Sequence, residues 1–127
     1  MNQKEKFIDF LTDSTKTGGI AWESRRVYMG MSPLVSQYIT NPDMVSQLFC
    51  SDVKGNNIYF VVQKYMKYVP EMDQYYEQFT CFLLVLDGDT LVYSVYESEV
   101  SEDMLNNLLE EIRGKQESDF YENFMKK

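Results

Sequence analysis

The most pronounced hydrophobic pattern of the chain lies between residues 78 and 97, where two apolar runs flank a short polar interruption. The first run, 79–86, is almost continuously apolar, which is typical of a strand that is buried on both faces. The second run, 90–96, is rich in Val, Tyr and Thr, the residue types that suit a pleated strand. The Asp-Gly-Asp sequence at 87–89 predicts a hairpin turn, because Gly adopts a positive φ at little cost. We expect this hairpin to form the centre of an antiparallel sheet.

A second hairpin is predicted upstream of the first. The runs 44–52 and 58–69 are both rich in β-prone residues, and the turn-forming residues 53–57 separate them. Residues 70–78 are acidic and contain two adjacent tyrosines. We expect this segment to be a link between the two hairpins.

The chain before the second hairpin combines a helical pattern with less regular ones. Residues 3–13 carry apolar side chains at i, i+3 and i+4, which predicts a short helix capped by Asn2. Residues 20–31 predict a strand with a shift of register, since the apolar positions change face along the run. Residues 34–40 predict an edge strand or an irregular link, because Pro33 is incompatible with a central strand.

Two further helices are predicted towards the C-terminus. Residues 102–113 carry Met, Leu and Ile at helical spacing, with Ser101 as the expected N-cap and Gly114 as the expected C-cap. Ser118 suits the N-cap of a last, short helix. The apolar residues of that helix are Phe120, Tyr121, Phe124 and Met125.

The order of these elements predicts an α+β fold. Five or six strands follow one another between N-terminal and C-terminal helices, which is typical of one antiparallel meander sheet with the helices packed on one face. The length of the chain suits one globular domain over residues 1–127.

The N-terminal segment resembles known proteins. A short helix followed by Thr-Gly-Gly-Ile-Ala-Trp-Glu at 17–23 is similar to the start of many small, mostly uncharacterised bacterial and phage proteins of mobile elements. The resemblance covers residues 3–23 only and includes no catalytic residue. It implies a mobile-element origin and no particular activity.

The composition argues against enzymatic chemistry. The chain has no histidine, which excludes the commonest general base, the Ser-His and Cys-His pairs and every His-containing metal site. The acidic residues match no metal-binding loop signature, and the glycines lie in no phosphate-binding motif. We therefore expect a protein that is not an enzyme, with no catalytic residue, no cofactor and no metal.

The expected compartment is the cytoplasm. The N-terminus has mixed charges and lacks the apolar segment of a secretory signal, and no apolar run is long enough to span a membrane. Cys50 and Cys81, both in predicted strands, are expected to be buried thiols rather than a disulfide.

The net charge of −8 is distributed unevenly along the chain. Residues 69–112 contain eleven Asp or Glu and no Lys or Arg, whereas residues 1–68 and 113–127 are weakly basic. Such a stretch repels nucleic acid and anionic membranes and attracts a basic protein. Tyrosines near the acidic link suit protein recognition, because Tyr combines a large contact area with a polar group. The candidate partner-binding residues are Tyr68, Glu71, Asp73, Tyr75, Tyr76, Glu77, Glu97, Glu99, Glu102 and Asp103.

These observations favour an inhibitor or an immunity-type protein that presents an acidic, Tyr-bearing face to a basic partner. A nucleic-acid-binding protein of host defence, blocked by mimicry of nucleic-acid charge, and a toxin are two partners with the same chemistry. Two alternatives stay open. One is a small-molecule sensor with a pocket lined by Phe, Met and Tyr. The other is a module that self-associates, as a homodimer, through an uncovered sheet face or a strand edge such as 58–69.

Overall fold

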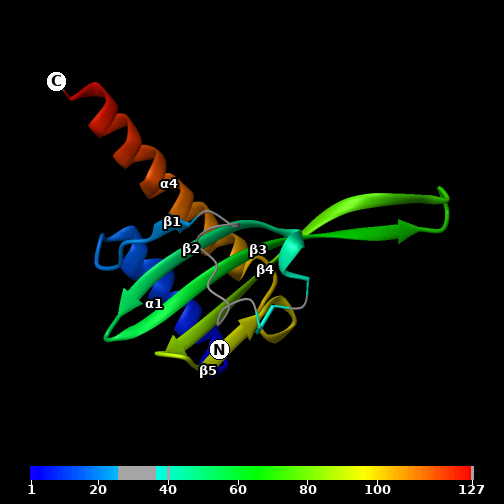
Figure 1. The fold of residues 1–127 in the computed structure, drawn as a ribbon, viewed down its shortest axis with the longest axis horizontal. Coiled ribbons are helices and arrows are strands. Elements are labelled where there is room, and N and C mark those ends of the chain that lie inside the picture. Colours follow the sequence, from blue (N-terminus) through cyan, green and yellow to red (C-terminus); the bar gives the residue numbers. More distant parts are fainter. Residues whose placement is uncertain (26–36, 40, 127) are drawn as a thin grey trace. The chain divides into compact units, whose positions relative to one another are not determined.

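The computed structural model describes residues 1–25, 37–39 and 41–126 (Figure 1). The chain divides into two compact units. One unit comprises Met1–Trp22 and Val95–Lys127, and the other comprises Glu23–Ser94. The prediction of a single globular domain stays a prediction.

A five-stranded antiparallel sheet follows the order of the chain, β1-β2-β3-β4-β5, and is therefore a meander. The α+β class and the meander sheet are confirmed, with five strands. We expected the 79–96 hairpin at the centre of the sheet, and this prediction is wrong. The middle strand is β3, and β5 is an edge strand. A continuous apolar run shows that a strand is covered on both faces, and a strand next to the edge meets this condition too. The strands are β1 Glu23–Arg25, β2 Val45–Val53, β3 Asn56–Val69, β4 Gln74–Asp87 and β5 Thr90–Tyr96.

Residues 81–86 of β4 are all buried, as their apolar run predicts. On one face of the sheet, Leu48, Val61 and Phe82 face one another across β2, β3 and β4 and belong to a core cluster. On the opposite face, Phe49 and Phe60 are paired across β2 and β3, with ring centroids 6.4 Å apart and an edge-on geometry. Both faces of these three strands are therefore core.

Both predicted turns are confirmed, although β2 ends at Val53 and β3 begins at Asn56, inside the segment 53–57 predicted as a turn, and the predicted link is wrong. Lys54 and Gly55 have positive φ in the β2–β3 turn, and Gly88 has φ of 60° in the β4–β5 turn. The predicted link 70–78 is mostly strand, because β3 continues to Val69 and β4 begins at Gln74. Main-chain pairing across the two strands overrides the polar composition of residues 74–78.

The N-terminal helix α1, Gln3–Lys16, begins as predicted and ends three residues later. Asn2 caps it, because its side chain accepts a hydrogen bond of 2.8 Å from the Glu5 backbone N–H. The Glu5 carboxylate accepts in turn from the Asn2 backbone N–H at 3.0 Å, which completes a capping box. Helix α1 packs against the C-terminal helix α4, Met104–Met125.

Helix α4 replaces the two helices predicted for this region. It begins at Met104 rather than at residue 102, and Asp103, with φ of 70°, precedes it instead of a capping Ser101. It continues through Gly114 and Ser118 to Met125. Gly costs about 1 kcal/mol in a helix interior, and the helix-forming residues around it can offset that cost.

The segment between α1 and β2 is described only in part. Of the predicted strand 20–31, only Glu23–Arg25 is strand, and residues 26–31 lie outside the described residues. Within 34–40, the described residues 37–39 form a turn. A short 3-10 helix, η1 Pro42–Met44, precedes β2. Packing of both helices on one face of the sheet stays a prediction.

Cys50 and Cys81 are free and buried, as predicted. Among the helices of the described residues, none is both long and apolar enough to cross a membrane.

Candidate functional site

The outer ends of β3 and β4 form a two-stranded ribbon, which we call the hairpin arm and define as residues 64–79. Strand β2 pairs with β3 only as far as Gln63, which lies opposite Val45. Beyond Gln63, β3 and β4 continue to pair with each other for six residues, to Val69 and Gln74. At about 3.3 Å per residue, the paired part of the arm is roughly 20 Å long. The arm projects beyond β2 as the green ribbon at the right of Figure 1.

The tip of the arm is the four-residue loop 70–73, Pro-Glu-Met-Asp. Pro70 has the fixed φ that suits the second position of a turn. The Met72 N–H donates to the Val69 carbonyl at 3.2 Å, and the Asp73 N–H donates to the Pro70 carbonyl at 3.3 Å. Asp73 has φ of 49°, a left-handed conformation that Asp adopts more readily than most residues. The turn therefore places two carboxylates, Glu71 and Asp73, in a tight exposed loop.

Tyr68 and Tyr75 lie directly opposite each other next to this loop. Their ring centroids are 5.0 Å apart with the planes inclined by 47°. The Tyr68 hydroxyl donates a hydrogen bond to the Asp73 carboxylate. This hydrogen bond raises the pKa of Tyr68, because it stabilises the protonated phenol. The hydrogen bond fixes the position of the exposed Tyr68 ring relative to the Asp73 carboxylate.

The face of the arm that carries this ring pair is mainly apolar. Register places Met66 beside Glu77, and Lys64 beside Phe79, on the same face as Tyr68 and Tyr75. We call this the aromatic face of the arm. Its four large side chains are between 44% and 66% exposed, so they form a contiguous accessible strip; they are Met66, Tyr68, Tyr75 and Phe79.

The opposite face of the arm is more polar. Lys67 lies beside Tyr76, and Tyr65 beside Gln78. The Tyr76 hydroxyl lies 3.0 Å from Gln74 Oε1 and 3.1 Å from Met72 Sδ. This hydroxyl is therefore occupied within the arm, and Tyr76 is less exposed than Tyr75.

At the base of the arm there is an open depression of about 370 Å³. Asp43 and Met44, from η1, form one side of it, and Lys64, Glu77 and Phe79 form the other. The depression continues the aromatic face towards the body of the sheet, because Phe79 belongs to both.

The ten predicted partner-binding residues fall into two groups. The structure gathers six of them on the arm: Tyr68, Glu71, Asp73, Tyr75, Tyr76 and Glu77. The other four belong to the compact unit that comprises Met1–Trp22 and Val95–Lys127, where Glu97 and Glu99 lie in the 3-10 helix η2, Glu97–Glu99, and Glu102 and Asp103 precede α4. With Ser101 and neighbouring residues, three of these four line a shallow depression of about 400 Å³.

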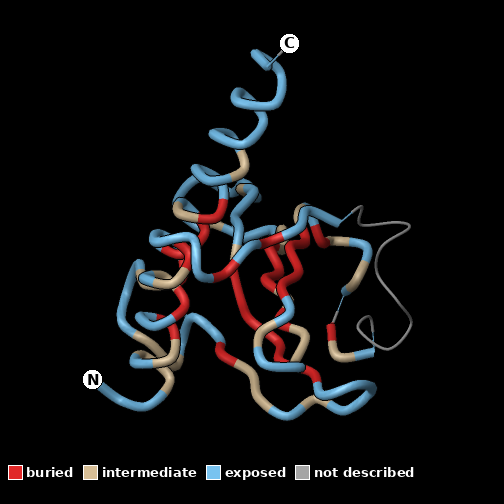
Figure 2. Tube along the Cα trace, turned by 90° about the vertical axis from the view of Figure 1, so that its left-hand side faces the viewer, coloured by how far each residue is buried: buried red, intermediate tan, exposed pale blue. Residues whose placement is uncertain are grey.

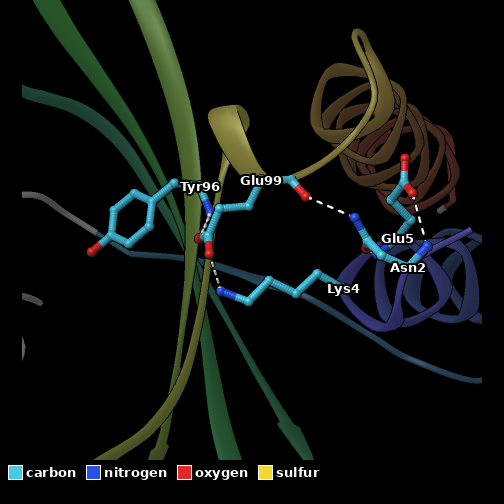
Figure 3. A network of polar contacts seen from close by, with 5 residues as sticks. All are labelled: Asn2, Lys4, Glu5, Tyr96 and Glu99. Atoms are coloured by element: carbon cyan, nitrogen blue, oxygen red, sulfur yellow. Dashed lines mark hydrogen bonds and ion pairs between the residues drawn. The ribbon is translucent and has the colours of Figure 1, made fainter.

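Glu99 has a structural role in that unit (Figure 3). Its carboxylate forms an ion pair with Lys4 and accepts a hydrogen bond of 3.1 Å from the Tyr96 N–H, and its carbonyl accepts from the Asn2 side chain at 3.1 Å. The hydrogen bond from Lys4, and then that from Tyr96, lower the pKa of Glu99. Glu99 therefore connects the start of α1 to η2.

Glu5 makes a second connection of the same kind. Its carboxylate accepts from both the hydroxyl and the backbone N–H of Ser101, the latter at 2.9 Å. The hydroxyl contact is the main reason why the pKa of Glu5 is lowered. Glu5 and Glu99 thus both connect α1 to the segment before α4.

Sequence reasoning missed the apolar part of the arm. Met66 and Phe79 lie in predicted strands, where an apolar residue is expected to be buried. The signal that could have found them is the end of β2 pairing, because a ribbon without a third strand leaves both its faces open. Across the described part of the chain, no cluster of three or more Cys, Asp or Glu is placed to hold a metal ion. Comparison with protein-family models, curated proteins and solved structures gives no match.

Proposed function

We propose that the protein is a non-enzymatic binding protein that inserts its hairpin arm into, or lays it against, a basic protein partner. The observation that carries the proposal is the exposed Tyr68–Tyr75 ring pair, set beside an acidic loop at the end of a projecting ribbon. The distal part of the arm, residues 69–79, contains three carboxylates and no cation, whereas Lys64 and Lys67 lie earlier in β3, so the whole arm has a net charge of −1. The tip of the arm thus combines apolar area with negative charge.

The two components have different parts in binding. Tyr side chains supply a large, rigid contact area with little loss of conformational entropy, and such residues dominate the binding energy of many interfaces. Exposed carboxylates at the rim contribute mainly to the rate of association and to the choice of partner. Glu71, Asp73 and Glu77 would therefore steer a basic surface towards the aromatic face.

The architecture of the arm supports the same conclusion. A two-stranded ribbon is marginally stable in water unless a further layer covers it. Cross-strand aromatic pairs contribute roughly 0.2–1 kcal/mol to the stability of a strand pair. The Tyr68–Tyr75 pair alone therefore offsets only part of the stability that the arm lacks without a covering layer. A partner that covers Met66 and Phe79 would supply the missing layer.

The partner class follows from the charge. A protein that binds nucleic acid presents the kind of basic surface that the arm carboxylates Glu71, Asp73 and Glu77 attract, and blocking that surface would make this protein an inhibitor. A basic toxin, neutralised by an immunity-type protein, offers the same chemistry. Capture of one or the other identifies which version applies.

The test is a capture experiment with charge-matched variants. One variant reverses the arm carboxylates Glu71, Asp73 and Glu77 to Lys. The control reverses three exposed carboxylates outside the arm, Asp9, Asp52 and Glu110, and so has the same net charge. Tagged proteins are exposed to lysate at low salt and eluted with a salt gradient.

We expect the native protein and the control to retain a basic protein that elutes as salt rises, and the arm variant to lose it. Equal retention by both variants, or capture that does not depend on salt, contradicts the proposal. Competition by added DNA or RNA then separates a nucleic-acid-binding partner from a toxin that does not bind nucleic acid.

A further inference from the structure

The C-terminal half of α4 is a second exposed surface, unrelated to the arm. The buried residues of this helix are confined to its first half: Leu105, Leu108, Leu109 and Ile112. Every residue from 117 to 126 is exposed, and Figure 2 shows these turns in pale blue up to the C-terminus. Nothing in the described part of the chain covers them.

This exposed half carries four large apolar side chains, which we call the aromatic stripe. Phe120 stacks on Phe124 with centroids 5.7 Å apart and planes inclined by 21°, and contacts Tyr121 edge-on at 5.9 Å. The four residues are between 57% and 74% exposed; they are Phe120, Tyr121, Phe124 and Met125.

The aromatic stripe does not continue the buried stripe of the same helix. At about 100° per residue, its centre is rotated by roughly 140° from the centre of the buried residues. A helix that only extended the core would keep its apolar residues on one line. The change of face indicates a separate contact surface.

We propose that the aromatic stripe is the interface of a homodimer, in which the α4 helices of two copies cross in an antiparallel orientation. A two-fold axis makes such a contact self-complementary, since the same four side chains meet their own equivalents. The inference goes beyond the proposed function, because it uses neither the arm nor a basic partner.

The charge around the stripe favours a second copy over other occupants. Residues 113–127 contain four basic and three acidic side chains and have a net charge of only +1, so two copies can approach here with little of the repulsion expected between the 69–112 segments. A basic partner finds no net attraction at such a helix. An anionic membrane surface repels a protein of charge −8, and surface-binding helices usually carry a basic polar face.

The antiparallel direction follows from Glu117. This residue lies four positions before Tyr121 and seven before Phe124, and therefore on the stripe side of the helix. A parallel pair would place the two Glu117 carboxylates opposite each other within the contact. An antiparallel crossing moves them to opposite ends.

The area sets the expected strength. An aromatic side chain buries 150–250 Å², so each exposed stripe residue still offers roughly 100–150 Å². Four such residues give about 500 Å² per copy and about 1,000 Å² for the pair, the lower limit for a specific interface. The dimer is therefore expected to be weak and dependent on concentration.

Sedimentation equilibrium of the full chain tests the proposal. The native protein should change from the 15.0 kDa monomer to a dimer as its concentration rises. Replacing Phe120 and Phe124 by Gln should raise the dissociation constant at least tenfold. The matched control replaces the exposed Phe10 and Phe79 by Gln, on α1 and on the arm, and should leave dimerisation unchanged. Far-UV circular dichroism verifies that both variants are folded.

Three results would overturn the inference. The first is a monomer at every concentration up to the millimolar range. The second is a dimer that persists when Phe120 and Phe124 are replaced, or that is lost in the Phe10 and Phe79 control. The third is a monomer that binds vesicles of anionic lipid through the stripe, with binding lost in the Phe120 and Phe124 variant.

Discussion

Replacing Gly114 by Ala should stabilise the protein. Gly114 lies in the interior of α4 with a helical backbone, and a Cβ atom added there meets no heavy atom within 4 Å. The substitution therefore introduces no clash and reduces the conformational freedom of the unfolded chain. Gly is less favourable than Ala in a helix interior by roughly 0.5–1 kcal/mol. The unfolding free energy should increase by up to that amount.

The contrast with a glycine that has positive φ makes the prediction sharper. Gly88 has φ of 60° in the β4–β5 turn, and a Cβ atom there is also free of contacts within 4 Å. Ala is disfavoured in this conformation by roughly 1–2 kcal/mol. Gly88→Ala should therefore destabilise the protein, although both sites are equally open. The two substitutions differ only in backbone conformation.

Urea unfolding and thermal melting measure both effects. For a chain of this length, 1 kcal/mol corresponds to about 4 °C in Tm. Gly114→Ala should raise Tm by about 2–4 °C and strengthen the helical circular dichroism signal, because the exposed second half of α4 frays less. A decrease in stability, of the kind expected for Gly88→Ala, would show that Gly114 ends a helix and would refute a continuous α4.

Three further predictions concern individual contacts. Trp22→Phe removes the hydrogen bond of 2.9 Å that the indole N–H donates to the buried Thr15 hydroxyl, and should lower the unfolding free energy by about 1–3 kcal/mol in urea titrations. The folded pKa of Glu99 lies below its ordinary value of 4.5, so its ionised form stabilises the protein above that pH, and the contribution is lost as pH falls through the folded pKa. Glu99→Gln should therefore be less stable than the native protein at pH 7 and equally stable in acid, as measured by unfolding at a series of pH values. Asp73→Asn removes the carboxylate that raises the pKa of Tyr68, so alkaline absorbance titration should show one tyrosine ionising at lower pH than in the native protein.

The main elements of the fold could be predicted because local signals agreed with the pairing. Asp-Gly at 87–88 specifies the β4–β5 turn, and Lys-Gly at 54–55 forms the β2–β3 turn, where both residues have positive φ. From that turn the antiparallel pairs of β2 and β3 continue in register from Val53 and Asn56 to Gln47 and Val62. The N-terminal helix was equally accessible, since Asn2 and Glu5 form a capping box that depends on sequence spacing alone.

The errors arose where tertiary context decides between two local readings. Gly114 suits a helix end, yet in α4 its neighbours continue the helix. Residues 74–78 are polar enough for a loop, yet pairing with 65–69 keeps them in β4. The apolar residues of the 79–96 hairpin do not specify its position within the sheet, because burial on both faces does not distinguish the middle strand from its neighbour.

The candidate site was predictable only in part, for a similar reason. A cation-free stretch is continuous along the chain, but its acidic residues are distributed between two compact units. Glu99 is committed to Lys4 and the start of α1, a contact that no spacing rule predicts across 95 positions. The acidic tip and its tyrosines were found from composition, whereas the exposure of Met66 and Phe79 depends on where β2 stops pairing.

The proposed function requires the hairpin arm to be the surface that contacts the partner. The most direct test is amide hydrogen exchange of the protein alone and in complex with the basic protein obtained by capture. A ribbon without a covering layer should exchange quickly in the free protein, since local opening is easy where few apolar contacts are buried. We predict that binding slows exchange most strongly within residues 64–79. Protection that falls elsewhere in the chain, with exchange in the arm unchanged, would contradict the account.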